Sequence, residues 1–215
     1  MQITFADILL ILKGTGITLS LCLCAILLGA VIGMVIGIMR ASKITILRGI
    51  SFIYIYIIRG TPLLMQLFLV YYGLPLLIGY SIPAFTTAVL GLTLYTGAYL
   101  AEIVKSGIWA IDKGQSEAAA ALGMTKWQEF FKIILPQAMR VIIPPGTGFF
   151  IALIKDSSLV SAIGFTELAR AGKLIISRTF EPFSVYLIIA AVYFIICYAL
   201  SKYSNKIEKK MRSAY

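Results

Sequence analysis

Histidine is absent from this sequence of 215 residues, cysteine occurs only three times, and charged residues make up only 13% of the chain. Cys22, Cys24 and Cys197 all lie in apolar stretches and form no CxxC pair, so we expect neither a metal site nor a disulfide framework. A typical soluble domain is about one quarter charged. The charge deficit, together with 60% hydrophobic residues and a mean hydropathy of +0.95, therefore indicates a membrane protein.

Long uncharged runs divide the chain into five predicted membrane spans, at approximately 14–40, 48–73, 84–111, 136–156 and 182–204. A bilayer core about 30 Å thick needs about 20 apolar residues in a helix. The run from Gly60 to Ala101 is too long for one helix, and Pro75, Gly79 and Pro83 divide it between two spans. We expect a single all-α transmembrane domain over residues 1–215.

Basic residues predict how this domain is oriented. Thirteen Lys and Arg residues follow spans one, three and five, whereas four lie on the opposite side. Because Lys and Arg concentrate in cytoplasmic loops, we expect the N-terminus outside and the C-terminus in the cytoplasm. The same distribution accounts for the formal charge of +10 without a nucleic-acid partner.

The loop between spans three and four, residues 112–135, is predicted to be cytoplasmic and helical. Ser116 is expected to cap a first helix that has Glu117 in its first turn and the alanine-rich stretch from Ala118 to Leu122 as its body. Gly123 suits the left-handed position that ends such a helix. The small side chains fit either a plug for a groove on a soluble partner or simply good helix formers.

A second helix is predicted to follow in the same loop. Thr125 and Gln128 have the spacing of a capping box. One apolar stripe then indicates an amphipathic helix at the membrane surface, formed by Trp127, Phe130, Phe131, Ile134 and Leu135.

The loop resembles the EAA loop of ABC importer permeases, the segment that docks into the ATP-hydrolysing subunit. The identities that carry this resemblance are Glu117, Ala118, Ala119, Gly123, Ile133, Leu135 and Pro136. The stretches 57–75, 95–124 and 154–168 resemble the permeases for polar amino acids of the histidine, glutamine and arginine type, and the resemblance covers most of the chain. It implies a type I ABC importer permease that contacts its ATPase through Glu117, Ala118, Ala119, Leu122 and Gly123.

The resemblance also implies partners. Permeases of that family work in pairs, with a second copy or a paralogue, two ABC ATPase subunits and an extracellular or periplasmic solute-binding protein, in the bacterial cytoplasmic membrane. This sequence has no GxxxxGK[ST] loop to hold phosphates, so we expect ATP and Mg to bind to the partner ATPase, and this chain to be no enzyme and to hold no cofactor. The alternatives are an ATPase-independent channel or secondary transporter and, third, an intramembrane enzyme.

Charges within the spans suggest where a solute binds, since such charges are costly at a helix centre. Arg59 and Glu102 lie at matching depth, so they either pair for packing or contact the solute. In the second interpretation the RGTP segment breaks span two and Pro62 opens a half-helix that, with Thr61, faces the carboxylate of an amino acid. Glu102 and Asp156 then receive the positive part of the solute.

Hydroxyl groups complete the predicted site, which contains no catalytic residue. Ser157 and Ser158 either donate to the solute or cap the end of span four, and Tyr99 either lines the pathway or packs in the core. Two carboxylates that face one pocket favour a cationic amino acid, arginine, lysine or histidine. A neutral or acidic polar amino acid such as glutamine is the alternative.

Two further patterns predict packing. Gly29, Gly33 and Gly37 form a repeated small-xxx-small pattern that allows another helix to approach span one closely. On the outer side, Thr166 is expected to cap a helix that runs to about Ser177.

Overall fold

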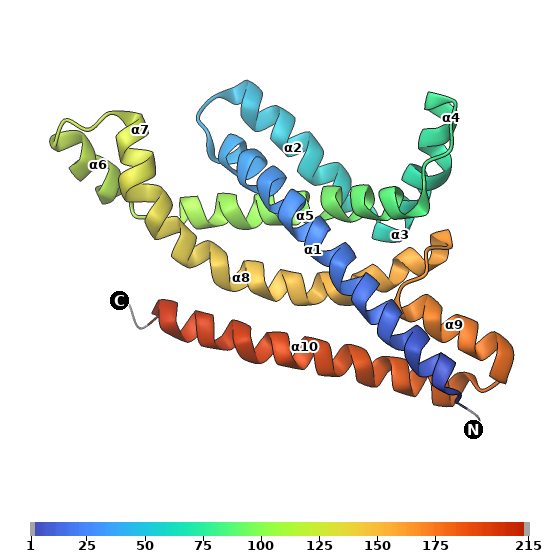
Figure 1. Cartoon of the computed structure of the whole chain (residues 1–215). Coiled ribbons are helices and arrows are strands. Elements are labelled where there is room, and N and C mark those ends of the chain that lie inside the picture. The colour runs from blue at the N-terminus through green and yellow to red at the C-terminus, as the bar shows by residue number, and fades with distance from the viewer. Residues whose placement is uncertain (1–2, 213–215) are drawn as a thin grey trace.

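The computed structural model describes residues 3–212, and nearly all of them are helical (Figure 1). In this part of the chain the long apolar helices are α1 (Phe5–Ala41), α5 (Ala84–Trp109), the helical run Lys126–Ile163 and α10 (Pro182–Arg212). The pair α2 (Thr45–Gly60) and Leu63–Ile78 bends by 104°, so there are four straight candidate spans, or five when this pair counts as one. The expectation of an all-α membrane protein is confirmed.

The remaining elements either join these helices or make up the run Lys126–Ile163. They are α3 (Leu63–Phe68), the π-helical turn η1 (Leu69–Gly73), α4 (Leu74–Ile78), α6 (Lys113–Ala121), α7 (Lys126–Glu129), the π-helical turn η2 (Phe130–Ile134), α8 (Leu135–Asp156), the 3-10 turn η3 (Ser157–Ile163) and α9 (Leu168–Thr179). Helices α6 and α7 lie at one end of the molecule, while α9 lies at the other end beside the start of α1 (Figure 1).

The three glycines of α1 bring this helix into close contact with α5, as their spacing predicts. A Cβ atom at Gly33 would lie 2.5 Å from the Cβ atom of Leu100, and one at Gly29 would lie 2.6 Å from that of Thr96. The same holds for Gly37 against Val104. The lack of a side chain at these three positions of α1 thus allows the short distance between the two helices.

Span two is broken where the RGTP segment predicts it. Helix α2 ends at Gly60, Thr61 is extended, and Pro62 caps α3. The direction after the break follows from packing, because the buried Leu67 of α3 sits against Gly91 of α5.

Helix starts differ from the sequence-based expectation at three places. Helix α1 begins at Phe5 rather than near residue 14, since Thr4 and Asp7 form a capping box. The first loop helix begins at Lys113, because the side chain of Asp112 accepts a hydrogen bond from the Gly114 N–H, so the prediction of a cap at Ser116 is wrong.

The third difference is at α9, which Glu167 caps instead of Thr166. The Glu167 carboxylate is fully buried and accepts hydrogen bonds from the N–H groups of Ala169 and Arg170. It also accepts from the hydroxyl groups of Thr18 in α1 and Tyr193 in α10. One carboxylate therefore joins three helices at this end of the molecule.

Candidate functional site

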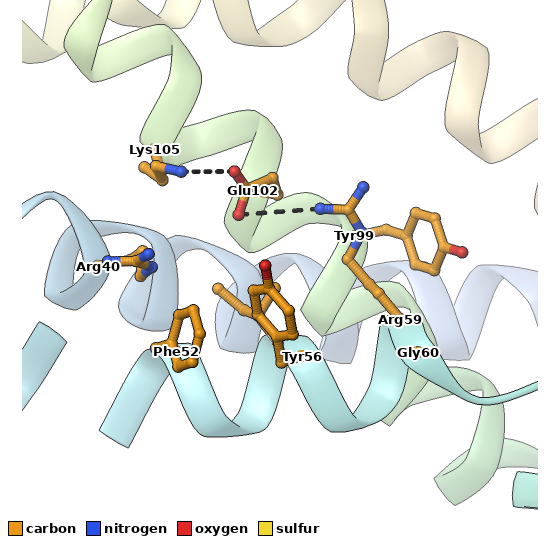
Figure 2. A pocket seen from close by; sticks show the side chains of 9 residues that line it. Arg40, Phe52, Tyr56, Arg59, Gly60, Tyr99, Glu102 and Lys105 are labelled. Carbon is orange, nitrogen blue, oxygen red and sulfur yellow. Dashed lines mark hydrogen bonds and ion pairs between the residues drawn. The ribbon is translucent and has the colours of Figure 1, made fainter. Parts of the chain in front are cut away.

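The break after α2 leaves an arginine at the end of a helix that faces α5. Arg59 lies in the last turn of α2, and Gly60 after it lines the same hollow. This hollow is a cavity of 430 Å³ between α2 and α5, with contributions from the end of α1. Its lining residues are Arg40, Phe52, Ile55, Tyr56, Arg59, Gly60, Tyr99, Glu102 and Lys105 (Figure 2).

Glu102 lies between two cations in this cavity. Its Oε2 atom is 3.8 Å from Nη1 of Arg59, and its Oε1 atom is 2.6 Å from Nζ of Lys105 (Figure 2). The Arg59 guanidinium also lies over the ring of Tyr99, 5.1 Å from its centroid. The ion pair that the matching depth of Arg59 and Glu102 suggests is therefore present.

Both partners of this pair remain accessible. The side chain of Arg59 is 40% exposed and that of Glu102 is 27% exposed. At 3.8 Å the contact between them is long for a hydrogen-bonded ion pair, whose N to O distance is about 2.7 to 2.9 Å. Both groups are thus accessible from the cavity.

A second cavity of 320 Å³ lies next to the first one. It shares Arg59, Tyr99 and Glu102 with the first cavity and extends between α5 and α8 as far as Val141 and Pro145. These three residues therefore border both cavities.

Asp156 lies apart from this cavity. Its Oδ2 atom is 3.5 Å from the hydroxyl oxygen of Tyr95. The Tyr95 ring contacts the Tyr99 ring at 4.5 Å between centroids, and Phe149 stacks on Tyr99 at 5.3 Å. An aromatic cluster thus connects Asp156 to the cavity without making it part of the lining.

The remaining predicted solute contacts are also placed elsewhere. Ser157 is buried and donates to the carbonyl of Ile154, and Ser158 lines a separate groove with Lys155 between α8 and α10. The Thr61 hydroxyl donates to the Ile57 carbonyl, and Pro62 follows it outside the lining. Of the eight predicted residues, the cavity therefore brings together Arg59, Tyr99 and Glu102.

Sequence reasoning missed two cations of the site. Lys105 is three residues after Glu102 on α5, and this helical spacing was the available signal. Arg40 lies over the ring of Phe52, 5.2 Å from its centroid, and no local pattern joins these two residues.

The predicted ATPase-coupling residues lie on α6 and the turn after it. Glu117, Ala118 and Leu122 are exposed, with Leu122 at 80%, whereas Ala119 is buried. Gly123 has the expected left-handed conformation, with φ at 72°, and the capping box of Thr125 and Gln128 is present. A Cβ atom at Gly123 would meet nothing within 4 Å, so the turn projects from the body of the chain.

Apolar spanning helices around a charged cavity, with a helical loop that projects at one end, define a subunit of a membrane transporter. The chain belongs to the family of binding-protein-dependent transport system inner membrane components, whose model matches residues 10–213. The predicted membership of the amino acid ABC permeases, and with it a transport role rather than a catalytic one, is confirmed by the relatives below.

An amino-acid ABC transporter permease of Bacillus subtilis (strain 168) is 40% identical over 93% of this chain and 88% of its own length. A glutamine transport system permease of Rickettsia typhi is 39% identical over 96% of this chain and 95% of its own length. The crystal structure of an amino acid ABC transporter with histidines has a TM-score of 0.88 and 40% identity, and covers 98% of this chain and 100% of its own. The type I ABC importer permease architecture is likewise confirmed.

Proposed function

We propose that the cavity between α2 and α5 binds a polar amino acid on its way through the membrane. Arg59 binds the α-carboxylate of the solute and Glu102 its ammonium group, while Tyr99 provides an aromatic wall. The observation that carries this proposal is that an accessible cation and an accessible carboxylate face one cavity at 3.8 Å. A zwitterion replaces their mutual contact with two contacts of its own.

The charge of the cavity bears on the choice of solute. The cavity is lined by three cationic side chains, Arg40, Arg59 and Lys105. In the described part of the chain Glu102 is the one carboxylate that lines it. The sequence-based preference for a cationic amino acid depends on Asp156 in the same pocket, and Asp156 lies outside it. We therefore propose a neutral polar amino acid such as glutamine as the cargo, with arginine, lysine or histidine as the second candidate because of the accessible Glu102.

The energy for transport comes from outside this chain. The family implies a binding protein and an ATPase partner in general. In our proposal two ATPase subunits bind ATP and Mg, and a second permease copy or paralogue completes the pathway in a bacterial cytoplasmic membrane. The cytoplasmic loop 112–135 couples the ATP-driven closure of the ATPase subunits to alternating access of the pathway. The exposed Glu117, Ala118 and Leu122 make the contact with the ATPase, and Gly123 makes the turn.

Equilibrium binding to the purified permease and ATPase complex tests the site. We expect Arg59→Met and Glu102→Gln each to weaken the binding of radiolabelled L-glutamine and L-arginine by about tenfold or more. Arg48→Met is the matched control, because Arg48 is exposed on the same helix about three turns earlier and does not line the cavity. Unchanged affinity for both solutes in both site variants would refute the proposed site.

Asp156→Asn distinguishes the two cargo classes. If the cargo is neutral, the affinity for L-glutamine stays within about twofold of the wild type. A selective loss of L-arginine binding would instead restore the cationic interpretation.

A further inference from the structure

Proline leaves a carbonyl at the end of α2 without its normal partner. In an α-helix the carbonyl of Ile58 accepts from the N–H of the residue four positions later, and that residue is Pro62, which has no N–H. Thr61 is also extended, so the chain has already left the helix at this point. The carbonyl of Ile58 therefore needs a donor from elsewhere, directly beside the backbone of Arg59.

Gln66 supplies this donor from the next helix. Its Nε2 atom lies 2.6 Å from the Ile58 carbonyl oxygen, 2.9 Å from that of Thr61 and 3.0 Å from the Thr61 hydroxyl oxygen. The side chain is 8% exposed, so water does not readily replace it. One amide group thus bridges the break, from the first turns of α3 back to the last turn of α2.

The orientation of this amide is fixed by its surroundings. A flipped amide would direct Oε1 at two carbonyl oxygens, which are acceptors only. In the observed orientation Oε1 is buried and accepts no hydrogen bond from the described residues. The two N–H donors are therefore the reason for a glutamine at this position, and they outweigh an acceptor without a partner.

Helix α3 anchors Gln66 in the core, whereas few residues of α2 are buried. Leu63 and Leu67 of α3 are buried in the main core cluster. In α2 only Ser51 and Ile55 are buried, and Arg59 itself is exposed. The position of Arg59 thus depends on what fixes the last turn of its helix.

We propose that Gln66 is a positioning residue that holds Arg59 in register with Glu102 and Tyr99, and thereby sets the recognition of the solute carboxylate. This inference rests on the proposed function, because it assigns to Arg59 the binding of that carboxylate. Gln66 does not line the cavity and acts through the backbone of the α2 terminus. Without its donors the last turn of α2 opens, and the guanidinium leaves the Tyr99 ring.

Carboxamide analogues separate positioning from a general structural effect. The measurement is equilibrium binding of L-glutamine and L-arginine, each compared with its α-carboxamide, to the permease and ATPase complex. Gln66→Met keeps the side-chain length and removes both donors. We expect it to weaken binding of the amino acids by on the order of tenfold and to change binding of the carboxamides by less than about twofold.

Two further variants complete the experiment. In an Arg59→Met background, Gln66→Met is expected to have no additional effect, because the residue through which it acts is gone. Thr93→Val is the matched control, since the Thr93 hydroxyl group is buried and has no hydrogen-bond partner among the described residues, and its loss should leave binding unchanged. Size-exclusion elution and basal ATPase activity verify that each complex has assembled.

Each outcome decides the inference. Equal weakening of amino acids and carboxamides, a full additional effect in the Arg59→Met background, or no effect of Gln66→Met would overturn it. If Gln66→Met does not assemble with the ATPase, Gln66→Asn is measured in the same way, because its amide is too short to reach Ile58. If neither variant assembles, Gln66 is a residue required for folding, and the positioning role is refuted. If Arg59→Met itself leaves binding unchanged, the proposed function fails, and the inference falls with it.

Discussion

Gly33→Ala adds one methyl group at the contact between α1 and α5. The new Cβ atom would lie 2.5 Å from the Cβ atom of Leu100 and 3.2 Å from both the Ala101 nitrogen and the Gly97 carbonyl oxygen. These atoms belong to the α5 backbone or are bonded directly to it, so no rotamer change relieves the clash. The two helices must separate, and such overpacking costs about 1 to 3 kcal/mol.

Gly16→Ala provides the reference for this prediction. Gly16 lies in the same helix and is exposed, and a Cβ atom there would meet nothing within 4 Å. Both variants gain the helix propensity of alanine, up to about 1 kcal/mol. The difference between their free energies of unfolding therefore isolates the clash, which we expect at about 1 to 3 kcal/mol.

Reversible unfolding of the purified chain in mixed detergent micelles measures this difference. The unfolding midpoint of Gly33→Ala should be lower than that of Gly16→Ala under identical conditions. If Gly33→Ala is as stable as Gly16→Ala, the close contact between α1 and α5 is not present in the folded chain, and the reasoning is refuted.

Two other variants test features away from the cavity. Glu167→Gln has a single side-chain acceptor and leaves one of the half-buried N–H groups of Ala169 and Arg170 without its carboxylate partner, so we expect a loss of about 1 to 3 kcal/mol in the free energy of unfolding, measured by the same assay. Burial raises the pKa of Glu167, so the folded chain binds this proton more readily than the unfolded chain. The contribution of Glu167 to stability should therefore fall as the pH rises from the ordinary glutamate pKa toward the raised one. Glu167→Gln should lack this dependence, and the same pH dependence of stability in the variant and the wild type would contradict the prediction. Gly123→Leu places a side chain at a φ of 72°, at a cost of about 1 to 2 kcal/mol. We expect the variant chain to insert into the membrane but to lose ATP-driven uptake in proteoliposomes. Normal uptake would contradict the coupling role of the loop.

Local patterns predicted those parts of the fold that depend on local chemistry. The glycine spacing of α1 predicts a close helix contact, and the RGTP segment predicts a break, because both depend on what one or two residues lack. The angle of 104° at the break does not follow from Pro62 alone, because α3 also packs on α5 through Leu67. The predicted start of the first loop helix is wrong because Asp112 and Ser116 are both good N-cap residues. Of the two, it is Asp112 that caps the helix, with its side chain accepting a hydrogen bond from the Gly114 N–H.

The site shows the same division. The equal depth of Arg59 and Glu102 follows from counting residues along two helices, and the structure places the two side chains together. The depth and rotation of Asp156 depend on α8, which stays helical through Pro144 and Pro145 instead of breaking there. The side chain consequently lies beside Tyr95 rather than in the cavity, a position that only the packing of α5 against α8 determines.

The π-helical turn η2 joins the loop to α8, and Pro136 accounts for it. Pro136 has no N–H for the carbonyl of Lys132, so the chain widens by one residue, and the Leu135 N–H reaches back five residues to the Phe130 carbonyl. Pro136→Ala restores the missing donor and allows an ordinary α-helical turn, which would rotate α7 relative to α8 by up to about 100°, the angle of one helical residue. If the loop contacts the ATPase as proposed, while α8 borders the second cavity through Val141 and Pro145, Pro136→Ala should retain ATPase activity and lose uptake per ATP hydrolysed in proteoliposomes. Pro144→Ala is the matched control, since the chain is already α-helical at that position. Equal uptake per ATP in the two variants would show that the π-helical turn does not determine the orientation of the loop relative to α8.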